Sequence, residues 1–164
     1  MRQVDPPHHP LEVLDARGVR RWYAASLGVL TLHRRTVDEL NVFPVPDGDT
    51  GTNLAATLTA ACVALEDLDD TALLPEITHR AARGALLGAR GNSGVIVAQI
   101  LRGLADTWGV EAVNAERLAA GLRHAAHSAN DAVAAPAEGT ILTVARVASE
   151  TAGRHSASSL EAAV

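Results

Sequence analysis

Apolar residues recur at intervals of three or four positions along most of the chain. Between residues 11 and 40 this stripe is formed by Val19, Trp22, Tyr23, Leu27 and Leu30. Such spacing places the side chains on one face of an α-helix, and no combination of glycine and proline interrupts it. The pattern predicts a long helix within residues 11–40.

The same periodicity resumes after a break at residues 41–51, which hold too many prolines and glycines for a helix. Pro75 suits the first turn of one later helix, and Gly109 ends another. Asn114 is the expected N-cap of a long alanine-rich helix that Pro136 ends. Further helices are expected at residues 54–68, 75–86, 97–108, 114–135 and 141–153.

Two features favour an all-α fold. No segment alternates apolar and polar residues with a period of two, and 32 of the 164 residues are alanine, the strongest helix former. Gly153 is expected to end the sixth helix, and Ser158 or Ser159 to cap a seventh. Helices this rich in small side chains are expected to pack with their backbones close together.

The basic residues exclude several functions. All 14 of them are arginine, so the chain has no lysine. This excludes a nucleotide-binding loop of the G-x-x-x-x-G-K-[ST] type, a Schiff-base lysine and the strand lysine of protein kinases. The formal net charge is −5 and the arginines are scattered, so no basic stripe for nucleic acid is expected.

The remaining composition indicates a cytoplasmic protein with one domain over residues 11–164. Cys62 is the only cysteine, which suits a reducing compartment. The sequence contains neither a secretory signal pattern nor an apolar stretch long enough to span a membrane. Residues 1–10, with three prolines and two histidines, are expected to form a disordered tail.

The loop over residues 41–53 is the densest cluster of functional groups. Asp47 and Asp49 are separated by one glycine, which allows their carboxylates to share a hard divalent cation. Thr50, Thr52 and Asn53 add oxygen atoms and lead into a helix, whose first amides can bind an anion. The alternative is that both aspartates are turn and capping residues, for which D-G sequences are common.

Two more glycine-containing breaks precede helices. In residues 84–94, Asn92 or Ser93 is the expected helix cap, while Gly84 and Gly88 are more typical of close helix packing than of a ligand site. In residues 136–140, the negative charge of Glu138 is expected to interact favourably with the dipole of the following helix, and Thr140 is a candidate contact to phosphate or ribose. The alternative is that both residues only form the boundary of that helix. His124 and His127 share a helix face, but no neighbouring acid or thiol completes a metal site there.

Three motifs in this order resemble the N-terminal kinase domain of bacterial fatty acid kinase, a relative of the nucleotide-binding subunit of dihydroxyacetone kinase. They are LNVFPVPDGDTGTNL at 40–54, GALLGARGNSGVIVAQILRG at 84–103 and EGTILTVA at 138–145. The resemblance implies an antiparallel barrel or bundle of helices that binds ATP or ADP and two Mg²⁺ ions at one end. It implies metal ligands at Asp47, Asp49 and Asn41, and nucleotide contacts at Thr50, Gly51, Thr52, Asn53, Asn92, Ser93, Gly94, Gly139 and Thr140.

The motifs also indicate the branch of the family. The dihydroxyacetone type generally reads G-D-G-D-H-G, whereas this chain reads P-D-G-D-T-G and R-G-N-S-G. The fatty acid branch implies transfer of phosphate to a fatty acid carboxylate held by a separate fatty-acid-binding carrier protein. Because the chain has no lysine, the charge of the phosphoryl group must be neutralised by metal ions, helix amides and arginine. Arg90 is the arginine nearest to the motifs, and its alternative role is structural pairing.

Compared with the family pattern, the chain is expected to be truncated at its C-terminus by one or two helices and by further domains, through which a homodimer would form. No residue is assigned as a covalent nucleophile. Two alternatives stay open at this stage: a small-molecule kinase of the dihydroxyacetone type, and a catalytically silent nucleotide-binding regulatory module.

Overall fold

The structure is a computed structural model that describes residues 13–43 and 45–161. The tail expected over residues 1–10 lies outside the described residues. Six helices and two short strands follow one another in these described residues: β1 (Leu14–Asp15), α1 (Ala16–Leu40), α2 (Thr50–Val63), α3 (Leu74–Leu87), α4 (Gly91–Thr107), β2 (Ala112–Val113), α5 (Ala115–Asp131) and α6 (Ile141–Glu161).

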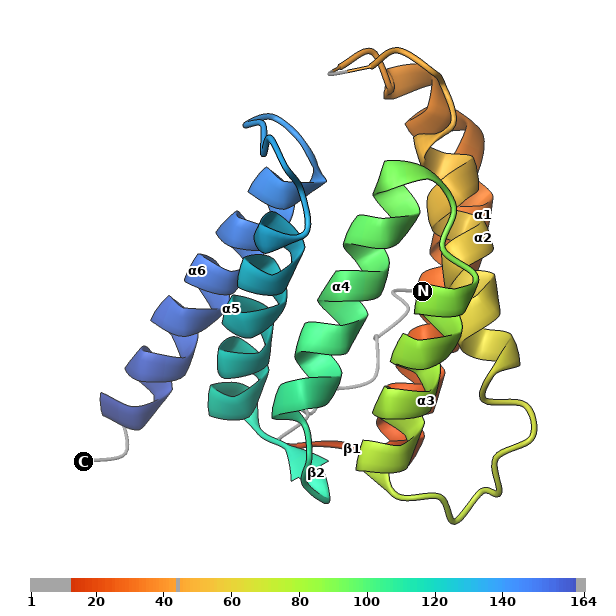
Figure 1. Cartoon of the computed structure of the whole chain (residues 1–164). Helices are drawn as coiled ribbons and strands as arrows, with labels where there is room; N and C mark the ends of the chain where they lie inside the picture. The colour runs from red at the N-terminus through yellow and green to blue at the C-terminus, as the bar shows by residue number, and fades with distance from the viewer. Residues whose placement is uncertain (1–12, 44, 162–164) are drawn as a thin grey trace, which may run out of the picture.

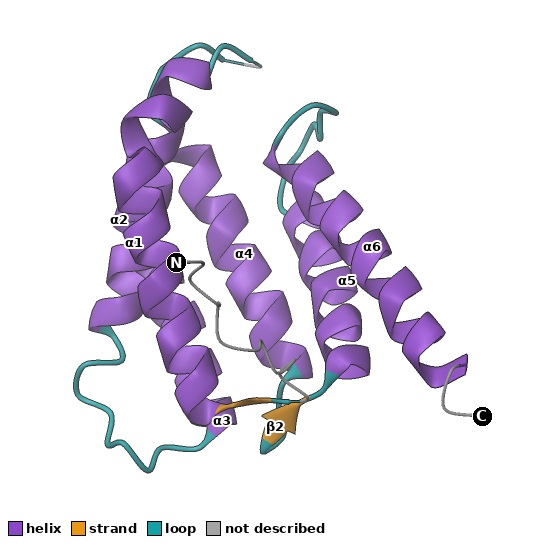
Figure 2. Cartoon of the chain, turned by 180° about the vertical axis from the view of Figure 1, so that it is seen from behind, coloured by secondary structure: helices purple, strands orange, loops and turns teal. Residues whose placement is uncertain are grey.

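Successive helices run up and down, so the expected all-α antiparallel bundle is confirmed (Figures 1 and 2). The helix α4 lies in the middle, with α1, α2 and α3 on one side and the α5–α6 hairpin on the other. Within the described residues the only sheet is the antiparallel pair of β1 and β2, where Leu14 is opposite Val113. None of the described helices is both long enough and apolar enough to cross a membrane.

Most predicted helix starts agree with the structure. Asn114 caps α5 by accepting a hydrogen bond from Arg117 N at 2.9 Å, and a proline stands in the first turn of α3. The expected end of α5 near Ala135 is wrong, because the helix stops at Asp131. Pro136 disfavours the helical conformation of the residue before it, so the chain must leave the helix earlier.

Two other predicted boundaries are also wrong. The helix α2 ends at Val63 rather than near Leu68. Beyond that end, Arg20 donates hydrogen bonds to the carbonyl oxygens of Leu65, Leu68 and Asp69, which stabilises a turn in place of further helix. The helix α6 continues through Gly153 to Glu161, so there is no separate helix capped by Ser158 or Ser159. A single glycine costs a helix only about 1 kcal/mol, which the neighbouring turns offset.

Small residues let the helices approach closely, as expected. At Gly84 an added Cβ would lie 2.7 Å from the carbonyl oxygen of Ala60, and at Gly103 it would lie 2.6 Å from Cα of Ala125. A Cβ at Gly88 would overlap the Cβ of Ala60. Gly84 and Gly88 are therefore confirmed as packing positions between α2 and α3.

Candidate functional site

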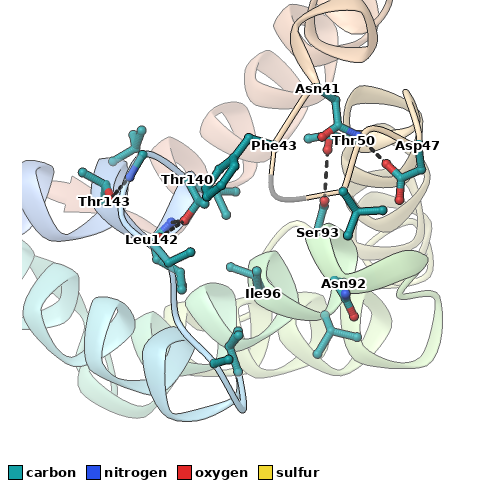
Figure 3. A pocket seen from close by; sticks show the side chains of 18 of the residues that line it. Asn41, Phe43, Asp47, Thr50, Asn92, Ser93, Ile96, Thr140, Leu142 and Thr143 are labelled. Carbon is teal, nitrogen blue, oxygen red and sulfur yellow. Dashed lines mark hydrogen bonds between the residues drawn. The ribbon is translucent and has the colours of Figure 1, made fainter.

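Three segments far apart in the sequence meet at one end of the bundle and line a cavity of about 900 Å³. They are the end of α1 with the loop that follows it, the first turn of α4, and the connection from α5 to the start of α6. In Figure 3, Asn41, Asp47, Thr50 and Ser93 lie on one side of the cavity. Thr140, Leu142 and Thr143 lie on the opposite side of the cavity (Figure 3). Each of the three predicted motifs contributes to the walls.

The loop between α1 and α2 brings two predicted metal ligands together. Gly48 has φ +65°, a conformation that side chains disfavour, and this turns the chain between the two aspartates. The Asn41 side chain donates a hydrogen bond from Nδ2 to Asp47 Oδ1 (Figure 3). The six-residue separation in sequence thus becomes a direct side-chain contact.

Asp49 stands at the N-cap of α2, yet its side chain makes no capping hydrogen bond. Asp38, on the last turn of α1, caps the helix instead. Its Oδ1 accepts from Thr52 N at 2.9 Å and its Oδ2 accepts from Thr52 Oγ1 at 2.8 Å. Desolvation, which raises the pKa of a carboxyl group, is outweighed at Asp38 by hydrogen bonds from Thr52 and from the Gly51 backbone, so the pKa lies below its usual value.

The Asp49 side chain does not have the capping role that was one of the two considered for it. The carboxylate is half-buried, and in the part of the chain that the structure describes no hydrogen bond or ion pair reaches it. Together, Asp47, Asp49 and Asn41 offer two carboxylates and an amide oxygen, donors that suit a hard divalent cation. No group of three or more His, Cys, Asp or Glu side chains that could hold a metal occurs among the described residues, so the amide would have to complete the set.

The first turns of α2 and α4 are tied to each other. Thr50 Oγ1 and Ser93 Oγ are 3.3 Å apart. Thr57, which is fully buried, donates to the carbonyl oxygen of Asn53 at 2.8 Å and accepts from Arg90 N at 3.2 Å. These bonds fix where α4 begins relative to the loop that carries the aspartates.

The expectation that Asn92 or Ser93 caps α4 is wrong. The N-cap of α4 is Arg90, two or three residues earlier than expected; the helix begins at Gly91, and no side chain makes a capping bond. Gly91 has φ +55°, and a Cβ there would overlap the Asn53 side chain. Among the described residues no side chain accepts a hydrogen bond from the first amides of α4. Helix amides left without an acceptor can bind an anion.

Charge is scarce around the cavity. Among the described residues that line it, Asp47 carries the only ionisable side chain. Arg90 has an exposed side chain and does not line the cavity. Its proposed role in neutralising phosphate therefore finds no support in this geometry.

The α5–α6 connection closes the far side of the site. Gly139 has φ +81° and lines the cavity with Thr140. The Thr140 hydroxyl donates to the carbonyl oxygen of Ala137 at 2.8 Å and accepts from Leu142 N at 3.3 Å, so it already serves as a turn and cap residue. Glu138 accepts from the hydroxyl of Thr143, and this bond, with the nearby Arg146, lowers its pKa.

The twelve predicted site residues divide into two groups. Those that line the cavity are Asn41, Asp47, Thr50, Asn92, Ser93, Gly139 and Thr140. Those that do not are Asp49, Gly51, Thr52, Asn53 and Gly94. Several of the second group have packing roles: a Cβ at Gly51 would overlap the carbonyl oxygen of Arg34, and one at Gly94 would overlap Thr57 Oγ1.

Sequence reasoning missed Asp38 and Thr57. Thr57 had a signal, because it is a polar residue within the apolar stripe of α2, beside Leu54, Leu58 and Ala61. Asp38 had none, because its partner is 14 positions away. The two histidines of α5 each approach a different acid: His124 lies 3.8 Å from Asp106 and His127 lies 3.3 Å from Asp131, as exposed pairs.

Comparison with known proteins places the chain in a family. A family model described as the DAK2 domain matches residues 44–164. Protein YloV of Bacillus subtilis is 41% identical over 143 residues, which are 87% of this chain and 26% of that protein. An uncharacterized protein of Staphylococcus saprophyticus is 44% identical over 124 residues, 75% of this chain and 22% of its own. The chain thus spans about a quarter of the length of these curated relatives. Since the matched domain covers most of the chain, the protein belongs to the DAK2-domain family, a dihydroxyacetone-kinase-like family associated with kinase function.

Proposed function

We propose that the chain is an ATP- and Mg²⁺-dependent phosphotransferase domain that acts in the cytoplasm. Its acceptor is a fatty acid carboxylate presented by a separate carrier protein, and its product is an acyl phosphate. The observation that carries the proposal is the meeting of three motifs at one cavity, which contains the hydrogen-bonded pair of Asn41 and Asp47. Asp49 follows two residues after Asp47 and makes no capping hydrogen bond.

The charge of the cavity supports dependence on a metal. A nucleoside triphosphate carries several negative charges, while the only ionisable side chain among the described lining residues is another carboxylate. Mg²⁺ held by Asp47, Asp49 and Asn41 would supply the positive charge that these side chains lack. The free amides at the start of α4 add partial positive charge where phosphate oxygens would lie.

The same scarcity of ionisable groups favours a carboxylate acceptor over a hydroxyl acceptor. A hydroxyl group needs a general base to take its proton, and no histidine or spare carboxylate lines the described cavity. Carboxylic acids have pKa values of about 4, so at pH 7 the acceptor arrives without its proton. One of its oxygens bonds to the γ-phosphorus while the bond to the bridging oxygen breaks, and ADP leaves with the electron pair.

The proposal is tested by binding and by turnover. Titration calorimetry with ATP, with and without Mg²⁺, is expected to show binding only with the metal. Combining Asp47→Ala with Asp49→Ala is expected to lower that affinity at least about 10-fold. The matched control combines Asp67→Ala with Asp70→Ala, which removes two exposed aspartates from the α2–α3 connection at the opposite end of the bundle.

Turnover is measured by trapping acyl phosphate with hydroxylamine, with the fatty acid supplied on a lipid carrier. Phosphorylation of a small hydroxy-ketone, with none of the fatty acid, would contradict the acceptor and favour the dihydroxyacetone-type alternative. Binding of MgATP without any transfer would favour the regulatory module. Unchanged MgATP binding in the Asp47→Ala, Asp49→Ala variant would contradict the metal site itself.

A further inference from the structure

We propose that Asp38 is a positioning residue: by capping α2 from the end of α1, it keeps the Asp49 carboxylate available to a divalent cation. The inference rests on the proposed function, because it takes Asp49 as a metal ligand. It adds a residue outside all three motifs, and it predicts what the site does when that residue is removed.

The other helix caps of this molecule show what Asp49 would otherwise do. Asp15 and Asn114 are both N-caps with an extended backbone, at ψ 179° and 177°. Each accepts a hydrogen bond from the amide three residues later, Gly18 N at 2.7 Å and Arg117 N at 2.9 Å. Aspartate at an N-cap usually makes this bond.

At α2, the amide three residues after the N-cap already donates to another carboxylate. The residue three positions after Asp49 is Thr52, whose amide and hydroxyl both donate to the Asp38 carboxylate. Asp49 itself has ψ 3° and makes no capping bond. Asp38 and Asp49 therefore compete for one donor, and in this structure Asp38 holds it.

The packing of α1 on α2 keeps Asp38 in place. The helices are so close at Gly51 that any Cβ there would overlap the carbonyl oxygen of Arg34, one turn before Asp38. The carbonyl oxygen of Asp38 also accepts from Asn41 N at 3.1 Å. The residue thus links the first turn of α2 to the start of the loop that carries the proposed ligands.

Removing the Asp38 side chain leaves the Thr52 amide without its partner. Asp49 then adopts the extended backbone of the other two caps and accepts from this amide with its own carboxylate. We expect Asp38→Ala to weaken the binding of Mn²⁺, used alone as the probe, about 10-fold. Asp38→Asn keeps an oxygen that can accept from Thr52 N, so it is expected to retain affinity to within about 3-fold although it removes the same charge.

Asp69→Ala is the matched control. Asp69 accepts from Thr71 N at 2.8 Å and from Thr71 Oγ1 at 2.6 Å, which is the same kind of clasp in the α2–α3 connection. Its removal is expected to leave Mn²⁺ affinity unchanged. Equal losses in Asp38→Ala and Asp69→Ala, or in Asp38→Ala and Asp38→Asn, would overturn the inference.

A second measurement needs no metal. Hydrogen exchange at the Thr52 amide is expected to stay slow in Asp38→Ala, because Asp49 becomes its acceptor, and to become fast when Asp49→Ala is added. Fast exchange in Asp38→Ala alone would show that Asp49 does not take over, which overturns the inference. Absence of Mn²⁺ binding by the unmodified chain would instead refute the metal site of the proposed function, so the two failures are distinguishable.

Discussion

A hydroxyl group and a glycine meet where α2 passes the first turn of α4. Thr57 Oγ1 bridges the carbonyl oxygen of Asn53 and the amide of Arg90, and it fills the space into which any side chain at Gly94 would project. The bridge joins the residue before α4 to α2, the helix that follows the loop with Asp47 and Asp49. The Thr57 bridge therefore contributes both to the packing of α2 on α4 and to the geometry of the site.

Gly94→Ala is expected to lower the free energy of unfolding by about 1–3 kcal/mol, because the new Cβ forces the buried hydroxyl out of place. Adding Thr57→Ala makes room for it, so the double variant is expected to lose less than the sum of the two single losses. Urea denaturation of the unmodified protein, the two single variants and the double variant measures this coupling. Additive losses of stability would contradict the contact between Gly94 and Thr57.

Gly28→Ala is the control for that series. Gly28 lies within α1, and nothing is within 4 Å of the position its Cβ would occupy. Alanine there is expected to leave stability unchanged or to raise it by up to about 1 kcal/mol, since glycine is the poorer helix former.

At the scale of single helices, the caps of α5 and α2 differ in kind. Asn114 caps α5 with its own side chain, so Asn114→Ala is expected to cost about 1 kcal/mol. Asp49 occupies the same position on α2 without making the bond. Asp49→Ala is therefore expected to change the stability of the metal-free protein by less than about 0.5 kcal/mol. A loss as large as that of Asn114→Ala, by urea denaturation without metal, would contradict the capping role of Asp38.

The cap on α2 also gives the protein a dependence on pH. The pKa of Asp38 is lower in the folded chain than in the unfolded one, where it is about 3.9. Its contribution to stability is therefore fully present above pH 3.9 or so and is lost as the pH falls through the folded value. Between pH 5 and pH 3 the unmodified protein is expected to lose more stability than Asp38→Asn, as followed by thermal unfolding. Parallel pH profiles would contradict this.

For the molecule as a whole, the helices differ in how many of their residues are buried. The central helix α4 buries residues along its length, including Ile96, Leu101 and Leu104, whereas Ser149 is the only buried residue among the described side chains of α6. The helix α6 packs mainly on α5. Yet its first turn forms one wall of the cavity.

Amide hydrogen exchange is therefore expected to be faster throughout α6 than in α4, because opening α6 exposes little apolar surface. Addition of MgATP is expected to slow exchange near Gly139 and near Asn92 together, since both line one cavity. Equal protection of α6 and α4 in the ligand-free chain would contradict the expected difference in local stability.

The helices and their order follow from local sequence. Apolar spacing, Pro75 and the Asn114 cap act within a few residues of one another, and there the predictions agree with the structure. The predicted ends at Leu68 and Gly153 fail for a different reason. Arg20 holds the turn beyond α2 from another helix, and the neighbouring turns of α6 outweigh one glycine.

The sequence by itself determined that this is an all-helical chain with three polar, glycine-containing breaks that resemble those of a kinase family. Only the tertiary structure decided that the three breaks share one cavity, that Asp38 rather than Asp49 caps α2, and that Gly51 and Gly94 serve close packing. The reason is physical: helix formation depends on neighbours three or four residues apart. The availability of a carboxylate depends on which donors arrive from distant parts of the chain.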